Sequence, residues 1–185
     1  MRKLRIVVVA LLVSAVIASP AVASGNVNFF LGQKMLEEGD WEPIENQGEF
    51  GAQITVGKEQ WPVQIAIDVL ASSKEDVVFG IDVRGGTVEV DFGVRKIFGK
   101  NDVHPFVGGG IASIFGVAEG ELFGFSVDDD DSAAGFWIDG GLFWRLGKRF
   151  NIGLDVRYSK AEITLFNVDV DAGGTHAGLL LGWGW

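Results

Sequence analysis

The sequence contains no cysteine and only two histidines, so neither a disulfide framework nor a thiolate metal site can form. Acidic residues outnumber basic ones by 25 to 15, and the formal net charge is −10. A chain this acidic lacks the basic surface that binds nucleic acid. Beyond residue 23 no apolar run approaches the length of about 18 residues that a transmembrane helix needs. These absences exclude disulfide-rich, nucleic-acid-binding and helical membrane proteins.

The first 23 residues, MRKLRIVVVALLVSAVIASPAVA, have the pattern of a secretory signal peptide. Three basic residues precede an apolar segment at 6–17, and Pro20 interrupts it before the small-residue motif at 21–23. The apolar segment is too short to span a bilayer as a helix. We therefore expect cleavage after Ala23, a single mature domain at 24–185 and a net charge of −13 after processing.

Several later segments alternate apolar and polar residues with a period of two, which is typical of β-strands. Four of them are EFGAQITV (49–56), VQIAIDV (63–69), VEVDFGV (88–94) and NIGLDVRYS (151–159). The non-apolar face of these segments is rich in glycine as well as charge. Inside a narrow barrel, side chains must be small or mutually paired, so this pattern favours a barrel with its apolar face outward.

The spacing of the segments predicts eight strands joined by alternately short and long connections. We expect strands at about 26–36, 47–56, 61–71, 87–98, 104–116, 133–146, 150–161 and 174–185. The predicted fold is thus all-β: a single eight-stranded antiparallel up-and-down transmembrane β-barrel with an apolar, lipid-facing exterior and a polar, glycine-rich interior. Ten strands are an alternative, because Gly85-Gly86 could turn a hairpin with 77–83 as a further strand. We favour a hairpin extension above the membrane.

Aromatic residues cluster beside the short connections, as in the girdles of transmembrane barrels. This predicted girdle comprises Phe29, Trp61, Phe98, Phe106, Trp144, Phe150, Trp183 and Trp185. A soluble sandwich has no reason to place aromatics at one end.

The chain ends in HAGLLLGWGW (176–185), with Leu179, Leu181, Trp183 and Trp185 on one face of the last expected strand. With the leader, HPFVGGGIASIFG (104–116) and GLFWRLGKRFNIGLDVRYS (141–159), this segment resembles the bacterial small outer-membrane β-barrel family that includes OmpX-like and opacity-type proteins. Members usually end in Phe, so Trp185 departs mildly from the pattern. The resemblance implies that the terminal strand is read by the barrel assembly machinery.

Three functions fit this pattern. We favour an integral outer-membrane barrel, exported through its cleaved leader, with a structural or surface-interaction role through long extracellular loops. A small porin is an alternative, although the interior of eight strands is just filled by side chains, with Ile97, Trp137, Phe143 and Leu180 pointing inward. A soluble, lipocalin-like ligand-binding barrel in the periplasm is a second alternative. The expected partners are outer-membrane lipid and lipopolysaccharide, the assembly machinery and an unidentified partner of the loops.

We predict no enzyme activity, no cofactor and no metal site. Some relatives are lipid A hydrolases with a Ser-His-acid group, but their His-x-Ser-Asn pattern is absent, since the residues from His176 read His-Ala-Gly-Leu. Nothing in the spacing places a hydroxyl near His176, which we expect to fill the lumen. The acidic run 128–131, like Asp169 and Asp171, falls in a predicted loop. We favour a solvated surface over a Ca²⁺ or Mg²⁺ site, because no glycine-containing calcium-loop pattern is present.

One lumen contact follows from the turn at 147–149. Leu146 and Phe150 must both face outward, so a three-residue turn pairs Asp139 with Arg157, both inward. Directly opposed side chains lie near enough for an ion pair. We therefore predict a lumen ion pair between Asp139 and Arg157.

Overall fold

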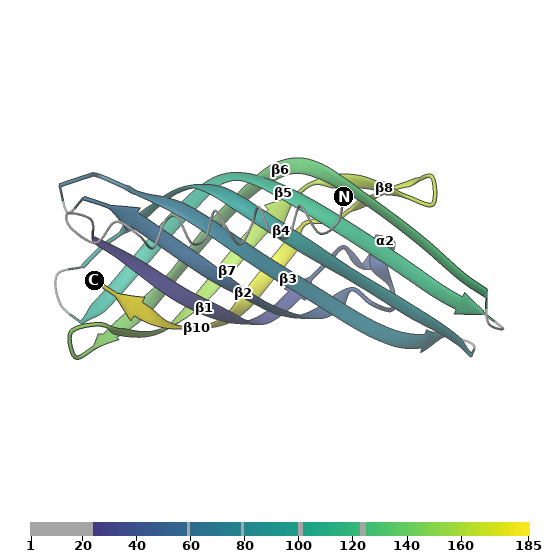
Figure 1. Cartoon of the computed structure of the whole chain (residues 1–185), viewed down its shortest axis with the longest axis horizontal. Coiled ribbons are helices and arrows are strands. Elements are labelled where there is room, and N and C mark those ends of the chain that lie inside the picture. The colour runs from purple at the N-terminus through teal and green to yellow at the C-terminus, as the bar shows by residue number, and fades with distance from the viewer. Residues whose placement is uncertain (1–23, 59, 79, 100–101, 123–124) are drawn as a thin grey trace.

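The protein forms a closed antiparallel β-barrel of eight strands (Figure 1). The structure is a computed structural model and describes residues 24–185 except 59, 79, 100–101 and 123–124. The predicted leader at 1–23 lies outside the described residues. Among those that are described, no helix is long and apolar enough to cross a membrane. The barrel strands are β1 (Ser24–Met35), β2 (Asn46–Gly57), β3 (Gln64–Val78), β4 (Ile81–Ile97), β5 (Val103–Leu122), β6 (Phe125–Leu146), β7 (Phe150–Lys160) and β10 (Gly174–Gly184).

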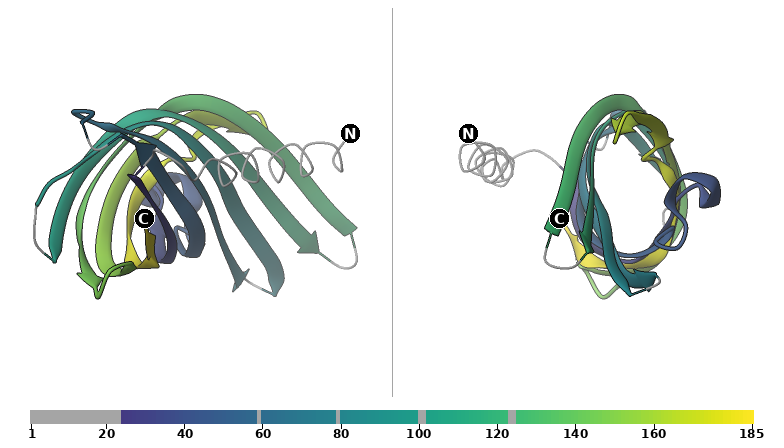
Figure 2. Two further views of the ribbon diagram at one scale, coloured as in Figure 1. Left: turned by 60° about the vertical axis from the view of Figure 1, so that its left-hand side comes forward. Right: turned by 90° about the vertical axis from the view of Figure 1, so that its right-hand side faces the viewer.

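Each strand pairs with its sequence neighbour, and β10 closes the ring by pairing with β1 and β7. Viewed along the barrel, the strands enclose a complete ring (Figure 2). At the seam, the Gly25 amide donates to the Trp185 carbonyl at 3.1 Å and the Trp185 amide donates to the Gly25 carbonyl at 3.0 Å. The predicted eight-stranded, up-and-down barrel is therefore confirmed, and closure leaves no exposed sheet edge along the shared wall.

The two ends of the barrel differ. The turn end carries the short connections after β2, β4 and β6, together with the C-terminus (Figure 1). The opposite end, which we call the cap end, carries a helical turn, α2 (Glu38–Trp41), between β1 and β2. It also carries a two-stranded hairpin, β8 (Glu162–Leu165) and β9 (Val168–Asp171), between β7 and β10.

Two of the predicted long loops are strands. β3 and β4 continue to Val78 and Ile81, and β5 and β6 continue to Leu122 and Phe125, so four strands project past the cap end of the others (Figure 2). Gly85 and Gly86 lie within β4 opposite Lys74 and Ser73, so this segment is a hairpin extension and not a turn. In these extensions the sequence no longer alternates apolar and polar residues as the other strands do. The backbone hydrogen bonds between neighbouring strands nevertheless continue.

The acidic run is the clearest correction. Asp128–Asp131 lies in β6, paired with residues 116–119 of β5, and Asp169 and Asp171 lie in β9. The prediction of a loop was wrong. Four consecutive charged residues do not alternate with a period of two, so the sequence pattern did not indicate a strand. Backbone pairing between strands, however, requires no particular side chain.

The two faces of the barrel wall follow the predicted alternation. Large apolar side chains such as Phe29, Leu154 and Ile111 are exposed on the outside, whereas Trp137, Phe143 and Leu180 are completely buried inside. The assignment of Phe106 to the aromatic girdle was wrong, because its side chain is buried in the lumen. Even-numbered residues of β5, such as Gly108 and Gly110, face the lumen, and Phe106 belongs to the same set.

We predict that deleting Trp183–Trp185 prevents barrel formation. The deletion removes the last pairs of β10 with β1 and β7 and both seam hydrogen bonds at Gly25, so the ring cannot close. Heat-modifiable gel mobility reports the folded barrel. The control is the double substitution Trp183→Phe and Trp185→Phe, which keeps the backbone and the aromatic face and should fold. Folded truncated protein at control levels would contradict the prediction.

Candidate functional site: a filled and capped lumen

The centre of the lumen is a buried network of charges. Arg95 of β4 and Arg157 of β7 each contact several carboxylates that the other strands present at the same depth. The carboxylates belong to Asp68, Asp91 and Asp139, and all five side chains are almost completely buried. Ion pairs and hydrogen bonds offset the cost of removing these charges from water.

The predicted partners Asp139 and Arg157 lie directly opposite one another on β6 and β7, and Arg157 Nη2 lies 3.4 Å from Asp139 Oδ2. They do not form an isolated pair. Asp139 is closer to Arg95, whose Nε donates to its Oδ2 at 2.9 Å, and Arg157 is closer to Asp68 and Asp91. Cross-strand pairing alone predicts only the nearest neighbours, whereas a narrow lumen brings strands from the far wall into reach.

Aromatic rings hold the two guanidinium groups in place. The Trp137 ring lies 4.7 Å from the Arg157 guanidinium carbon and 5.5 Å from that of Arg95. Gly108 makes room for this arrangement, because a Cβ there would lie 2.5 Å from Asp139 Oδ1 and 3.3 Å from the Trp137 ring. The inward glycines of β5 thus accommodate the largest side chains of β6.

A second polar cluster lies nearer the cap end, around His176. Ser159 Oγ lies 3.0 Å from His176 Nε2, and His176 Nδ1 lies 2.9 Å from both Glu49 carboxylate oxygens. Our expectation that no hydroxyl lies near His176 was wrong, because the pairing of β7 with β10 places Ser159 diagonally across from it. The three residues have the order of contacts found in an acid–His–hydroxyl catalytic group.

The surroundings of this triad do not suit a reaction. Ser159 and His176 are completely buried, and Ser159 Oγ also lies 2.9 Å from Glu89 Oε2. Lys34 Nζ lies 3.3 Å from the same carboxylate oxygen and donates to Thr87 Oγ1 at 2.9 Å. A substrate carbonyl cannot reach the hydroxyl in this conformation, because buried polar side chains surround it.

Towards the turn end, an apolar plug closes the barrel below the charges. It consists of inward side chains from five strands, namely Phe30, Leu70, Phe106, Phe143 and Leu180. Ile97, which we predicted to point inward, packs against it while remaining partly exposed. The side chains of the plug, like those of the charge network, are almost completely buried.

At the cap end, α2 and the β8–β9 hairpin fold over the mouth of the barrel. Trp41, Ile44 and Ile163 are buried against inward residues of the projecting strands, such as Ile114. The Trp41 indole donates to the Asp171 carbonyl at 2.8 Å, which joins the two connections. We call this buried apolar cluster the cap.

The acidic run fixes the cap hairpin. Asp131 Oδ2 accepts the Thr164 amide at 2.8 Å, and Asp129 Oδ2 accepts the Phe166 amide at 2.6 Å. The Thr164 and Ser132 amides hold the pKa of the Asp131 carboxyl below its usual range, so it stays ionised and keeps accepting. Among the described residues, no group of three or more carboxylates or histidines is arranged to hold a metal ion.

The residues expected to form the assembly signal share the outer face of the last strand. Leu179, Leu181, Trp183 and Trp185 are all exposed, and alternate with inward residues of β10. His104, at the start of β5, stacks on Phe143 with ring centroids 5.1 Å apart. Sequence reasoning placed Glu89 and Asp91 inward but did not connect them to Lys34 and Arg157, because those contacts cross the lumen.

Several solved structures share this architecture. The attachment invasion locus protein Ail of Yersinia pestis, in complex with the heparin analogue sucrose octasulfate, aligns with a TM-score of 0.62 at 13% identity, over 89% of this chain and 100% of Ail. This is the fold of the small outer-membrane β-barrels. A major outer membrane protein from Thermus thermophilus aligns with a TM-score of 0.54 at 12% identity, over 89% of this chain and 99% of that protein.

The N-terminal β-barrel domain of Pseudomonas aeruginosa OprF shares the architecture with a TM-score of 0.50 at 13% identity, over 88% of this chain and 97% of that domain. No protein-family model matches the chain, and the search of curated proteins gave no match.

We predict that Arg157→Ala lowers the free energy of unfolding by about 3–5 kcal/mol, because it leaves Asp68 and Asp91 short of a counterion. Asp139→Ala should cost less, about 1–3 kcal/mol, since both arginines keep Asp68. The double mutant should lose less than the sum of the two.

Urea unfolding in detergent, followed by gel mobility, measures this cycle. An Arg95–Asp139 cycle provides the comparison and should show the larger coupling, because that contact is shorter. Strict additivity of Asp139→Ala and Arg157→Ala would refute the predicted coupling.

Proposed function

We propose that the chain is an integral outer-membrane β-barrel protein with a structural or surface-interaction role, and that it does not conduct solutes. The observation that carries this proposal is the filled and capped lumen. The cap, the charge network and the plug block it in succession, and each is built from buried side chains. A water-filled pore would need none of these contacts and would leave lumen groups solvated.

The apolar exterior supports placement in a bilayer. Exposed Leu, Ile, Val and Phe side chains cover the outer wall, and exposed tryptophans Trp61, Trp144, Trp183 and Trp185 gather at the turn end. A soluble lipocalin-like barrel has the opposite arrangement, with its apolar face around an internal ligand. Interfacial tryptophans favour the headgroup level, so the turn end would lie at a membrane surface. Short turns mark the periplasmic side of such barrels, so this surface would be the periplasmic one.

Export through a leader cleaved after Ala23 and recognition of Leu179, Leu181, Trp183 and Trp185 by the barrel assembly machinery belong to the same proposal. Both rest on the resemblance of the two terminal segments to outer-membrane proteins. Outer-membrane lipid and lipopolysaccharide would surround the exposed apolar wall.

The surface outside the membrane would be acidic. Among the described residues of the cap end, exposed carboxylates far outnumber exposed cations. The cations are Arg84 and Lys160, and the carboxylates are Glu37, Glu38, Asp40, Glu42, Glu75, Asp82, Glu119, Asp128, Asp130, Glu162 and Asp169. Such a surface repels a sulfated polyanion like the one bound by Ail, so that ligand class does not transfer to this chain. We propose a cationic partner for the cap end, since opposite charge steers association.

Planar-bilayer recordings test the closed lumen. Purified protein reconstituted at amounts that give clear steps with a known porin should give no conductance steps. Deleting the cap hairpin, residues 162–171, should leave the protein closed as well, because the plug and the charge network remain. Reproducible single-channel steps from the intact protein would overturn the proposal.

Introducing a charge on the outer wall tests whether that wall faces lipid. Leu181 lies on the outer wall and is 45% exposed, and Val168, on the cap hairpin, is 58% exposed. Leu181→Arg should destabilise the protein in phospholipid vesicles by about 2–4 kcal/mol, because the charge would lie in hydrocarbon. Val168→Arg, the matched control outside the apolar wall, should change stability by no more than about 0.5 kcal/mol. Equal effects would show that Leu181 does not face lipid.

A further inference from the structure

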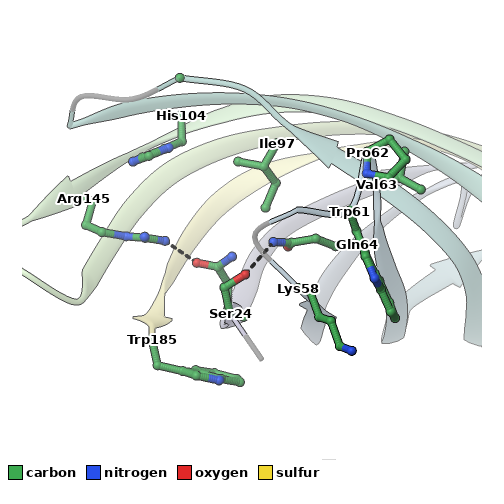
Figure 3. A pocket seen from close by; sticks show the side chains of 13 residues that line it. Ser24, Lys58, Trp61, Pro62, Val63, Gln64, Ile97, His104, Arg145 and Trp185 are labelled. Carbon is green, nitrogen blue, oxygen red and sulfur yellow. Dashed lines mark hydrogen bonds between the residues drawn. The ribbon is translucent and has the colours of Figure 1, made fainter. Parts of the chain in front are cut away.

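A cavity of about 320 Å³ opens at the turn end of the barrel, below the apolar plug (Figure 3). Residues from the start of β1, from Trp185 after β10 and from the β2–β3 and β4–β5 connections line this vestibule. Its floor is the plug, since His104 stacks on Phe143 and the Arg145 guanidinium carbon lies 5.4 Å from the same ring. The vestibule is therefore separate from the charge network above the plug.

Arg145 is the main charge of the vestibule. Its Nε donates to Asn151 Oδ1 at 3.1 Å and its Nη2 donates to Asn26 Oδ1. Both partners are neutral amides, and Arg145 forms no ion pair with any carboxylate in the described part of the chain. Arg95 and Arg157, in contrast, each contact two or more carboxylates.

The chain is built to admit this side chain. Gly184 of β10 lies beside it, and a Cβ at that position would lie 2.5 Å from Arg145 Nη2. Neutral amides fix the direction of the guanidinium group while leaving its charge uncompensated. A partly buried cation held in this way is preorganised for an anion.

The remaining lining extends the same chemistry. Lys58 and His104 add further nitrogen groups, and the Gln64 amide donates to Ser24 Oγ at 3.4 Å. None of the described lining residues carries an acidic side chain, although the sequence has 25 acidic residues against 15 basic ones. Asp102 also lies at this end of the barrel, and its carbonyl accepts the Arg145 amide at 2.7 Å. The described side chains that line the cavity are therefore basic or neutral, in contrast to the net negative charge of the protein.

We infer that the vestibule binds a phosphate-bearing group, with Arg145 as the principal ligand and His104 in the same lining. A guanidinium group matches the paired oxygens of a phosphate ester. The exposed indoles of Trp61 and Trp185 line the opening, and such rings favour the headgroup level of a bilayer. The group is thus either the headgroup of an anionic phospholipid from the adjoining leaflet or a soluble phosphate ester.

Titration of the purified, folded protein in non-ionic detergent tests the site. Inorganic phosphate and glycerol 3-phosphate are the probes, and tryptophan fluorescence and the NMR signal of the Arg145 Nε–H report binding. We expect saturable binding that Arg145→Gln weakens at least about tenfold, which corresponds to about 1.4 kcal/mol. Arg149→Gln is the matched control: it removes an exposed cation from the adjacent turn and should leave the affinity within about twofold.

Heat-modifiable gel mobility establishes that each variant is folded. Should Arg145→Gln fail to fold, His104→Gln serves in its place and is expected to weaken binding several-fold. Absence of saturation with both probes would overturn the inference. So would equal weakening by Arg145→Gln and Arg149→Gln, which would indicate general surface charge, or equal binding of uncharged glycerol.

Nanodiscs distinguish the two sources of phosphate. If lipid headgroups occupy the vestibule, glycerol 3-phosphate should bind more weakly in phosphatidylglycerol discs than in phosphatidylcholine discs. Equal affinity in both would assign the site to a soluble ester. The detergent titration does not depend on the proposed outer-membrane location, so a protein that binds phosphate but fails to enter discs would contradict that location alone.

Discussion

The pairing of β10 with β1 is the interaction on which the rest of this structure depends. Until these strands meet, the sheet has two open edges whose amides and carbonyls need partners. Within hydrocarbon no water can supply them, so closure is obligatory for a membrane protein of this kind. Closure also divides the side chains into two populations. Phe29 and Leu181 pair on the outer wall, while their neighbours Phe30 and Leu180 pair inside.

Once the ring is closed, its small circumference determines what the interior can hold. Side chains from opposite walls touch, so charges cannot remain solvated and must neutralise one another. Arg157 meets Asp68 and Asp91 from the far wall, and His176 of β10 meets Glu49 of β2. The interior is thus a polar core, stabilised by ion pairs and hydrogen bonds where a soluble domain would use apolar packing.

The two ends of the barrel are specialised by charge. At the cap end, Asp129 and Asp131 accept hydrogen bonds from the backbone of the cap hairpin, and the remaining carboxylates face outward. At the turn end, Arg145 is held by amides and has no carboxylate partner among the described residues. An acidic cap end and a basic vestibule at the turn end suit different ligands. The same fold can therefore carry two unrelated interactions, separated by the plug that includes Phe143 and Leu180.

The sequence by itself determined the strand pattern, the two faces of the wall and the pairing of Asp139 with Arg157 across a short turn, because each follows from a period of two and a local loop length. It did not determine the strand extensions at 128–131, since backbone pairing continues where the side-chain pattern stops. Only the tertiary structure decided that Ser159 meets His176, that Trp41 is buried in the cap and that Arg145 faces a vestibule. Those contacts join strands distant in sequence, and their partners depend on the stagger of the whole ring.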